Sequence, residues 1–165
     1  MSRAHVREVD GDVPEDLPEL PLSAAPNYVT ARGLAQLRRR LEDSAARLVA
    51  LPADERQTRA MIERERRWLN ARIASAQLID GMRAGSARIA FGALAEVVDA
   101  QAHRASWRIV GEDEAEPEAG RISWTSPLAR ALIGAAVGEV VNWQRPSGEA
   151  ELEVLAIDFR PEPTD

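Results

Sequence analysis

The spacing of leucine residues predicts a long amphipathic helix after Thr30. Leucines recur at intervals of three and four residues, and Ser44 fills the one position of this series that lacks a leucine. The series consists of Leu34, Leu37, Leu41, Leu48 and Leu51. Such spacing is typical of a coiled-coil seam. Thr30 is a suitable N-cap, so we expect the helix to begin at about Ala31.

A second helical pattern follows Pro52, which interrupts the first one. Its apolar side consists of Ile62, Leu69 and Ala76, spaced by seven residues, together with Ile73. Two amphipathic helices separated by a short break predict an antiparallel hairpin over residues 27–82, in which each helix buries its seam on the other. At about 1.5 Å per residue, its two arms would be about 30–40 Å long.

From Ala87 onward the pattern changes to that of short strands. Five runs rich in Val, Ile and Trp are separated by turn residues: ARIAFGALAEVVDA, ASWRIVG, GRISWTS, GEVVNWQ and AELEVLAIDF. Between the third and fourth runs, SPLARALIG predicts a short helix with Ser126 as its N-cap and Pro127 at its first position. RPSGEA is suited to a hairpin turn. We therefore expect an α+β domain over residues 83–165, a small antiparallel sheet with one short helix. Its expected core includes Leu128, Leu132 and Ile133.

Charge divides the chain into three segments. Residues 1–26 have two Arg and six acids and contain four prolines, so we expect a flexible acidic tail or an extended strap. Residues 27–80 have eleven Arg and seven acids, a net charge of +4. Residues 81–165 have eight Arg and fourteen acids, a net charge of −6. This asymmetry favours three segments with different roles.

Several kinds of chemistry are excluded by composition. The chain has no cysteine, which rules out disulfides and thiolate metal sites. Its two histidines, His5 and His103, are far apart and lack a zinc-binding spacing, so we expect no metal of its own. No glycine-rich phosphate loop or nucleophile elbow is present. No apolar run reaches the roughly 20 residues of a membrane span, so we expect no membrane contact and a cytoplasmic location.

The motifs of the second half resemble a known family. RIVGEDEA, GRIS followed by SPLARALIG, VGEVV and the turn before the last strand occur in the order found in the C-terminal domain of bacterial GreA/GreB transcript cleavage factors. NYVTARGLAQLRRRLE resembles the start of their N-terminal coiled coil, and FGALAEVVD resembles the strand after their linker. The resemblance covers roughly residues 27–159.

This resemblance implies a helical hairpin followed by an FKBP-like domain that docks on the rim of the RNA polymerase secondary channel. The hairpin enters the channel, and acids at its tip help to hold a magnesium ion of the polymerase. The polymerase then cleaves its own RNA, so the factor is not an enzyme. The implied docking residues are Asp113, Glu114, Ser126, Pro127 and Arg130. We expect a monomer that meets nucleic acid only through the transcription complex. The arginines of the hairpin either face a negatively charged channel or form a solvated helix face.

The tip is where the sequence departs from the family. Cleavage factors have a tip resembling GDxSENADY, whereas here only LPADERQTR separates the two helical patterns. The hairpin is therefore expected to be shortened. Asp54 and Glu55 are the candidate tip acids, but Pro52 fits the first position of the second helix and would place both acids in its first turn. They help to hold the shared magnesium ion, make other contacts at the tip, or only stabilise that helix.

Four functional hypotheses follow. The first is a non-enzymatic elongation regulator that binds RNA polymerase at the secondary channel. The second is a true cleavage factor that uses Asp54 and Glu55. The third, of another class, is an FKBP-like prolyl isomerase or chaperone-like module, although sheet topology alone does not confer that activity. The fourth is a dimerising coiled-coil adaptor.

Overall fold

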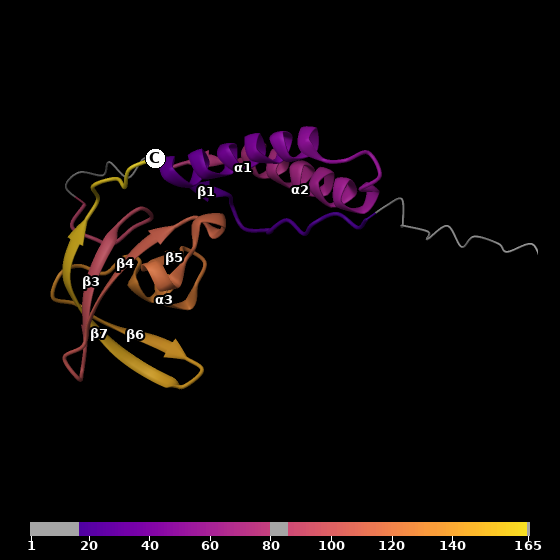
Figure 1. Ribbon diagram of the computed structural model, residues 1–165. Coiled ribbons are helices and arrows are strands. Elements are labelled where there is room, and N and C mark those ends of the chain that lie inside the picture. Colours follow the sequence, from indigo (N-terminus) through magenta and orange to yellow (C-terminus); the bar gives the residue numbers. More distant parts are fainter. Residues whose placement is uncertain (1–16, 80–85, 165) are drawn as a thin grey trace, which may run out of the picture.

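The computed structural model describes residues 17–79 and 86–164 and consists of a helix pair beside a curled sheet (Figure 1). Helix α1 spans Ala31–Ala50 and helix α2 spans Arg56–Ser75. Each has 20 residues, which corresponds to about 30 Å. The predicted N-cap is confirmed, because the Thr30 side chain accepts a hydrogen bond from the amide of Gly33. The part of the predicted tail before residue 17 lies outside the described residues.

The start of the second helix differs from the prediction. Pro52 lies in the loop, and α2 begins at Arg56 with Glu55 as its N-cap. Asp54 and Glu55 therefore lie before the first helical turn. The Glu55 amide donates to the Pro52 carbonyl, and the Arg56 amide donates to that of Asp54. The chain reverses its direction between Ala50 and Arg56, so Pro52 lies in this loop and not at the first position of the helix.

The predicted seam holds the two helices together. Leu37, Ser44, Ile62 and Leu69 are buried, whereas Leu48 and Leu51 towards the loop are only half-buried. Ser44 fits this interior because its hydroxyl donates to the Leu41 carbonyl and accepts from Arg66, so no polar atom of that side chain is left unpaired.

Two short strands join the ends of the helix pair. Strand β1 (Tyr28–Val29) precedes α1, strand β2 (Gln77–Leu78) follows α2, and the two are parallel neighbours. Asn27, which is buried, donates from its side-chain amide to the Arg72 carbonyl and to the Ser75 hydroxyl. Strands of two residues have no detectable periodicity, so the sequence pattern does not predict this pair.

The sheet has five strands in the order β5-β4-β3-β7-β6. Their bounds are Leu94–Asp99 (β3), Arg104–Val110 (β4), Arg121–Ser123 (β5), Val140–Arg145 (β6) and Gly148–Asp158 (β7). All five predicted runs contain a strand, and the RPSGEA turn joins β6 to β7. The expected antiparallel sheet is confirmed for the pairs β3–β4, β3–β7 and β6–β7, but at one edge β4 and β5 are parallel. The 3₁₀ turns η1 (Glu112–Glu114) and η2 (Pro117–Ala119) supply the crossover between them.

Helix α3 (Pro127–Leu132) packs on the sheet, as expected from its capping residues. Ser126 is the N-cap and accepts from the amide of Ala129, and Pro127 occupies the first turn. Leu128 and Leu132 are buried in the core with Ile109, Val97 and Val154. Ile133 was wrongly assigned to this core, because it follows the helix as its C-cap and is 40% exposed. Among the described residues, no helix is both long and apolar enough to cross a membrane.

Candidate functional site

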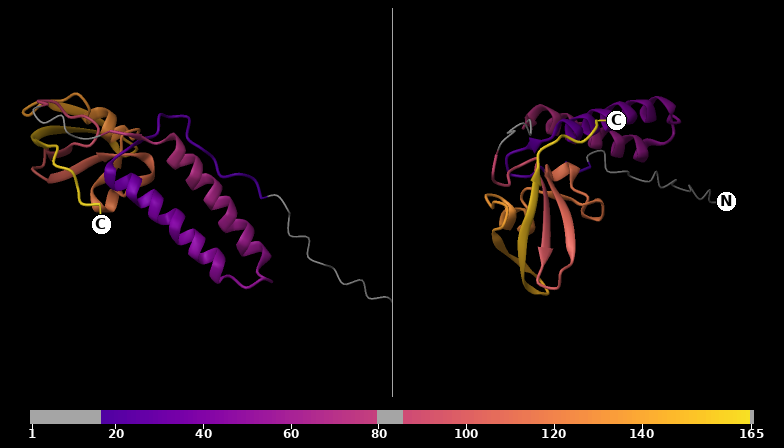
Figure 2. Two further views of the ribbon diagram at one scale, coloured as in Figure 1. Left: turned by 90° about the horizontal axis from the view of Figure 1, so that it is seen from above. Right: turned by 90° about the vertical axis from the view of Figure 1, so that its left-hand side faces the viewer.

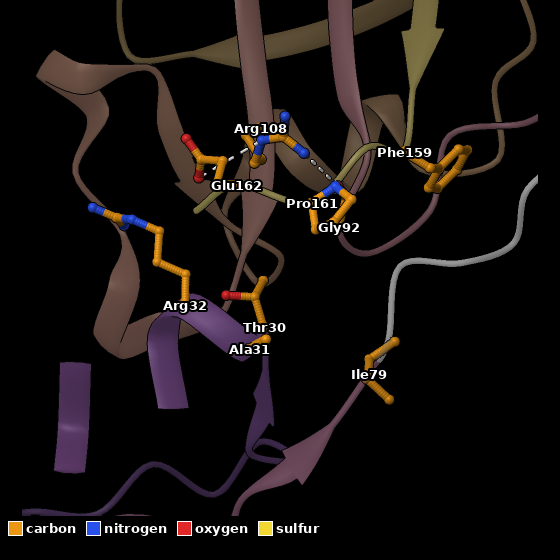
Figure 3. A pocket seen from close by; sticks show the side chains of 9 residues that line it. All are labelled: Thr30, Ala31, Arg32, Ile79, Gly92, Arg108, Phe159, Pro161 and Glu162. Carbon is orange, nitrogen blue, oxygen red and sulfur yellow. Dashed lines mark hydrogen bonds and ion pairs between the residues drawn. The ribbon is translucent and has the colours of Figure 1, made fainter. Parts of the chain in front are cut away.

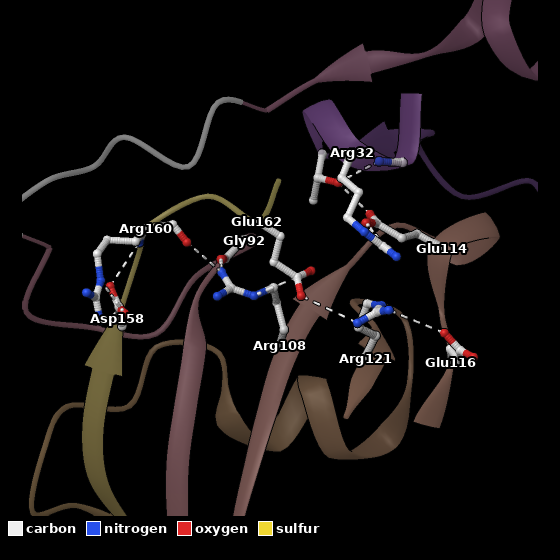
Figure 4. A network of polar contacts seen from close by, with 11 residues as sticks. Arg32, Gly92, Arg108, Glu114, Glu116, Arg121, Asp158, Arg160 and Glu162 are labelled. Atoms are coloured by element: carbon white, nitrogen blue, oxygen red, sulfur yellow. Dashed lines mark hydrogen bonds and ion pairs between the residues drawn. The ribbon is translucent and has the colours of Figure 1, made fainter. Parts of the chain in front are cut away.

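The helix pair meets the sheet domain through a buried carboxylate, Glu114. Its side chain is 2% exposed, and it pairs with Arg32 at 3.2 Å and accepts a hydrogen bond from the Thr30 hydroxyl (Figure 4). The same hydroxyl caps α1. Glu114 therefore connects the η1 turn to the first turn of α1, and a buried charge with these partners fixes the position of the helix.

A second ion pair connects η1 to the C-terminal end of α2. Arg72 is 3% exposed, and its Nε lies 2.6 Å from an Asp113 carboxylate oxygen. Its Nη2 lies 3.7 Å from Glu112. The η1 turn thus uses three consecutive acids to hold both helices. We call this set of contacts, Thr30, Arg32, Arg72 and Glu112–Glu114, the joint.

Close backbone approach completes the joint. Gly111, buried, leaves so little room that a Cβ atom there would lie 2.4 Å from the Tyr28 carbonyl oxygen. The Tyr28 ring lies 4.9 Å from that of Trp124 and 6.0 Å from that of Phe91, between centroids. The chain entering α1 is therefore packed directly on the sheet domain.

The C-terminal segment borders the joint on the other side. Glu162 pairs with Arg121 at 3.4 Å and with Arg108 at 3.7 Å (Figure 4). A pocket of about 40 Å³ lies beside it, with Thr30, Phe159 and Pro161 in its lining (Figure 3). That volume suits ordered water and is too small for a nucleotide or a peptide side chain.

The tip of the helix pair is exposed and sparsely bonded. Asp54 and Glu55 are both exposed, and Glu55 accepts a hydrogen bond from the Thr58 hydroxyl at 2.9 Å. Among the residues that the structure describes, no three His, Cys, Asp or Glu side chains gather in a way that could hold a metal ion. Magnesium usually keeps several waters and takes one or two protein carboxylates together with phosphate oxygens. Two exposed carboxylates therefore suit an ion that is shared with other ligands.

An open cleft that the sequence pattern does not predict lies on the sheet domain. It has a volume of about 410 Å³, and Trp107 and Trp143 line it from strands β4 and β6. Val97 and Leu152 belong to both the cleft and the core, so the cleft continues the apolar interior to the surface. The signal available in the sequence was a tryptophan in each of these two predicted strands. However, β3 and β7 separate β4 from β6 in the sheet, so the spacing of the two residues along the chain does not show that they line one cleft.

The predicted docking residues fall into two groups. Asp113 and Glu114 belong to the joint, where both are paired with arginines of the helices. Pro127 and Arg130 are exposed on α3, and Ser126, half-buried, caps that helix. Strand β5 contacts both η1 and α3, which places it between the two groups. Only the α3 group presents exposed side chains to a partner.

Comparison with known proteins assigns this arrangement to a family. Residues 84–159 match the family described as transcription elongation factor GreA/GreB, C-terminal. A transcription elongation factor GreA from Methylococcus capsulatus is 37% identical over 147 residues, which cover 88% of this chain and 90% of that protein. The chain belongs to the GreA/GreB family of transcription elongation factors. The GreA protein of Caulobacter vibrioides is 41% identical over 108 residues, 65% of this chain and 68% of that protein.

Solved structures of GreA/GreB relatives match with lower similarity. GreA factor homolog 1 of Thermus thermophilus is 26% identical with a TM-score of 0.40, over 81% of this chain and 99% of that one. A GreA/GreB factor from Nitrosomonas europaea is 18% identical with a TM-score of 0.40, over 79% and 97% of the two chains. The family assignment therefore rests on the sequence relatives. GreA/GreB factors bind RNA polymerase and are not enzymes themselves.

Proposed function

We propose that this GreA/GreB factor docks on the rim of the RNA polymerase secondary channel through its sheet domain, as a monomer, and modulates elongation by placing the helix pair in the channel. We further propose, from the family resemblance, that the helix pair is a coiled-coil hairpin and that the sheet with α3 is an FKBP-like domain. The observation that carries the proposal is the agreement between the family match over residues 84–159 and the domain that contains both the α3 group and the open cleft.

The proposed docking surface consists of the exposed start of α3 and the open cleft of the same domain. Pro127 and Arg130 lie on a helix whose N-cap and buried leucines fix its position. Exposed apolar side chains, Ile133, Val137 and Val140, follow the helix along the chain. The tryptophans of the cleft add aromatic surface next to charged residues, a composition typical of protein–protein contacts. A protein segment of the polymerase suits this surface better than nucleic acid does, because the domain has a net negative charge.

In this proposal the tip affects elongation because it occupies the secondary channel. Its acids contribute at most weakly to binding the magnesium ion of the polymerase. Glu55 is turned towards Thr58, and α2 starts only after the two acids. A carboxylate must come within about 2.1 Å of a magnesium ion to coordinate it. A hairpin shortened by two helical turns would withdraw its tip by about 11 Å, which no change of side-chain conformation recovers.

The docking half of the proposal is tested by binding to core RNA polymerase. Arg130→Ala is expected to weaken binding about five- to tenfold, since exposed interface arginines contribute about 1 kcal/mol or more. Arg160→Ala, at an arginine whose side chain is 88% exposed on the C-terminal segment, is the matched control and is expected to leave the affinity unchanged. Absence of binding by the unaltered chain at micromolar concentration would refute the proposal.

The tip half is tested with stalled elongation complexes. The factor is expected to leave the stalled RNA at its original length or to compete with an active cleavage factor. Shortening of the RNA that is lost in the Asp54→Ala, Glu55→Ala double variant would instead establish a true cleavage factor. Measurements at several magnesium concentrations separate the two cases, because only shared coordination of the ion makes the tip acids matter more at low magnesium.

A further inference from the structure

Residues 17–26 form an extended strap along the outer side of α2, away from α1 (Figure 2). Three side chains of α2 bind it. Arg64 donates to the Pro18 carbonyl at 3.3 Å, and Trp68 donates from its indole nitrogen to the Pro21 carbonyl at 3.1 Å. Between these contacts, Arg67 pairs with the Glu19 carboxylate at 2.8 Å.

These three side chains form one continuous surface on the helix. Positions 64, 67 and 68 are spaced by three and four residues, so they share one face of α2. The Trp68 ring is held in place by two guanidinium groups, of Arg40 at 5.5 Å and Arg72 at 6.0 Å from its centroid. The surface therefore offers hydrogen-bond donors in fixed positions, two for backbone carbonyls and one for a carboxylate.

The strap has the matching chemistry. Proline has no backbone N–H and a fixed φ, so Pro18, Pro21 and Pro26 favour an extended chain whose carbonyls are free to accept. Leu17 and Leu20 are half-buried, whereas Leu22 is 55% exposed, so one side of the strap faces the protein. At the other end, the Ser23 hydroxyl donates to Glu112, which is part of the joint.

We propose that the Arg64–Arg67–Trp68 face of α2 is a docking surface for an extended, acidic, proline-containing peptide, that residues 18–23 of this same chain are its occupant, and that the bound strap restrains engagement of the helix pair with polymerase. The restraining role rests on the function proposed above. A strap along α2 adds a third chain to the cross-section of the helix pair. It also neutralises an arginine of the segment that would enter the channel.

The contacts are suited to reversible docking. The Arg67–Glu19 pair is exposed, with 53% and 62% of the two side chains accessible, and exposed pairs of this kind are weak and sensitive to salt. Attachment through the start of α1 raises the effective concentration of the strap at its surface, so the docked form prevails although each contact is weak. A partner that competes for the arginines displaces it.

Glu19→Arg tests the proposal because it alters the strap and leaves the helix face intact. The heteronuclear NOE values of the Leu20 and Leu22 amides are expected to fall towards those of a flexible chain. The indole N–H resonance of Trp68, assigned with Trp68→Phe, is expected to move as its acceptor leaves. The charge-swapped double variant Glu19→Arg, Arg67→Glu is expected to restore both signals. Glu42→Arg makes the same charge change on α1 and is expected to alter neither.

The same variants then decide the restraining role. Glu19→Arg is expected to bind core polymerase about threefold more tightly or better, a factor typical of removing one exposed charge contact, and the double variant is expected to return to the original affinity. A released strap with unchanged or weaker polymerase affinity overturns the restraint. NMR signals that do not respond to Glu19→Arg overturn the docking surface itself.

Two further outcomes remain distinguishable. If the unaltered chain and the Glu42→Arg control both fail to bind polymerase, the proposed function and the restraining role fail, whereas the NMR signals still decide the docking surface. A dimer in sedimentation that dissociates in Glu19→Arg would assign the occupant to a second copy of the chain and overturn docking within one chain.

Discussion

The two ends of the helix pair differ in how firmly they are held. At the joint, Glu114 and Arg72 are buried and paired, and Gly111 permits direct backbone contact with Tyr28. At the tip, Asp54 and Glu55 are exposed, and α2 begins without a side-chain cap. The difference shows that the acids of the joint position the helices through ion pairs, whereas the exposed acids at the tip form no ion pair among the described residues, and Glu55 has only a hydrogen bond from Thr58.

The largest effect is expected from Glu114→Ala. Removing this carboxylate leaves Arg32 and Thr30 without their partner, and loss of one member of a buried ion pair costs about 3–4 kcal/mol. Chemical denaturation measures the change in the free energy of unfolding. Glu116→Ala is the control, because Glu116 also pairs with an arginine but is 60% exposed, and it should cost less than about 1 kcal/mol. Equal costs would contradict the contrast between buried and exposed acids.

Gly111→Ala should have the next largest effect, about 2–3 kcal/mol, because the added methyl group meets a backbone carbonyl that cannot move without displacing β1. Its φ of −69° is accessible to alanine, so the cost comes from the contact alone. Gly33→Ala is the comparison. There the new atom would lie 2.7 Å from a carboxylate oxygen of Glu114, which must shift against its partners Arg32 and Thr30, but a side chain can shift more easily than a backbone carbonyl. The better helix propensity of alanine offsets up to about 1 kcal/mol of this cost. Thermal unfolding should therefore rank Gly111→Ala below Gly33→Ala in stability.

The double variant Asp54→Ala, Glu55→Ala should change the free energy of unfolding by less than about 0.5 kcal/mol, because neither acid is buried or paired with an arginine of the described residues. Denaturation under the conditions used for Glu114→Ala provides the measurement. A loss of more than about 1 kcal/mol would show that the tip is as firmly determined as the joint.

The smallest effect concerns an exposed ion pair near the end of β7. A hydrogen bond from the Arg160 side chain lowers the pKa of Asp158 from 3.8 to about 2. Because the folded pKa lies below the ordinary value, this pair stabilises the fold above about pH 4, and that contribution is lost as the pH falls from 4 to 2. In Arg160→Ala the pKa of Asp158 should rise towards 3.8, as carboxyl NMR titration would detect. An unchanged pKa would assign the shift to another neighbour.

Local signals in the sequence were sufficient for the elements and insufficient for the contacts between them. Capping by Thr30 and Ser126, the leucine seam and the strand runs depend on neighbouring residues. The structure confirms the caps, a strand in each run, and the seam at its end near the joint. The parallel pairing of β4 with β5, the burial of Arg72 and the cleft between Trp107 and Trp143 depend on strand order and crossovers. No spacing along the chain encodes these contacts.

The acids of the η1 turn show the same limit. The family resemblance implies a docking role for Asp113 and Glu114, but it does not predict their contacts within the chain. The structure places both carboxylates against arginines of α1 and α2. An acid's solvent exposure follows from what packs over it, and here the packing residues are 41 and 82 positions away along the chain.

The parallel pair β1–β2 fixes the helix pair at one end and leaves its tip free. The strand before α1 and the strand after α2 are hydrogen-bonded to each other, so the two helices tilt together as one unit. Over about 30 Å of length, a tilt of about 5° at the β1–β2 end carries the free end through about 3 Å. A residue change that barely disturbs the β1–β2 end thus shifts the tip by roughly the length of a hydrogen bond. The position of the tip is therefore determined by residues at the opposite end of the helix pair.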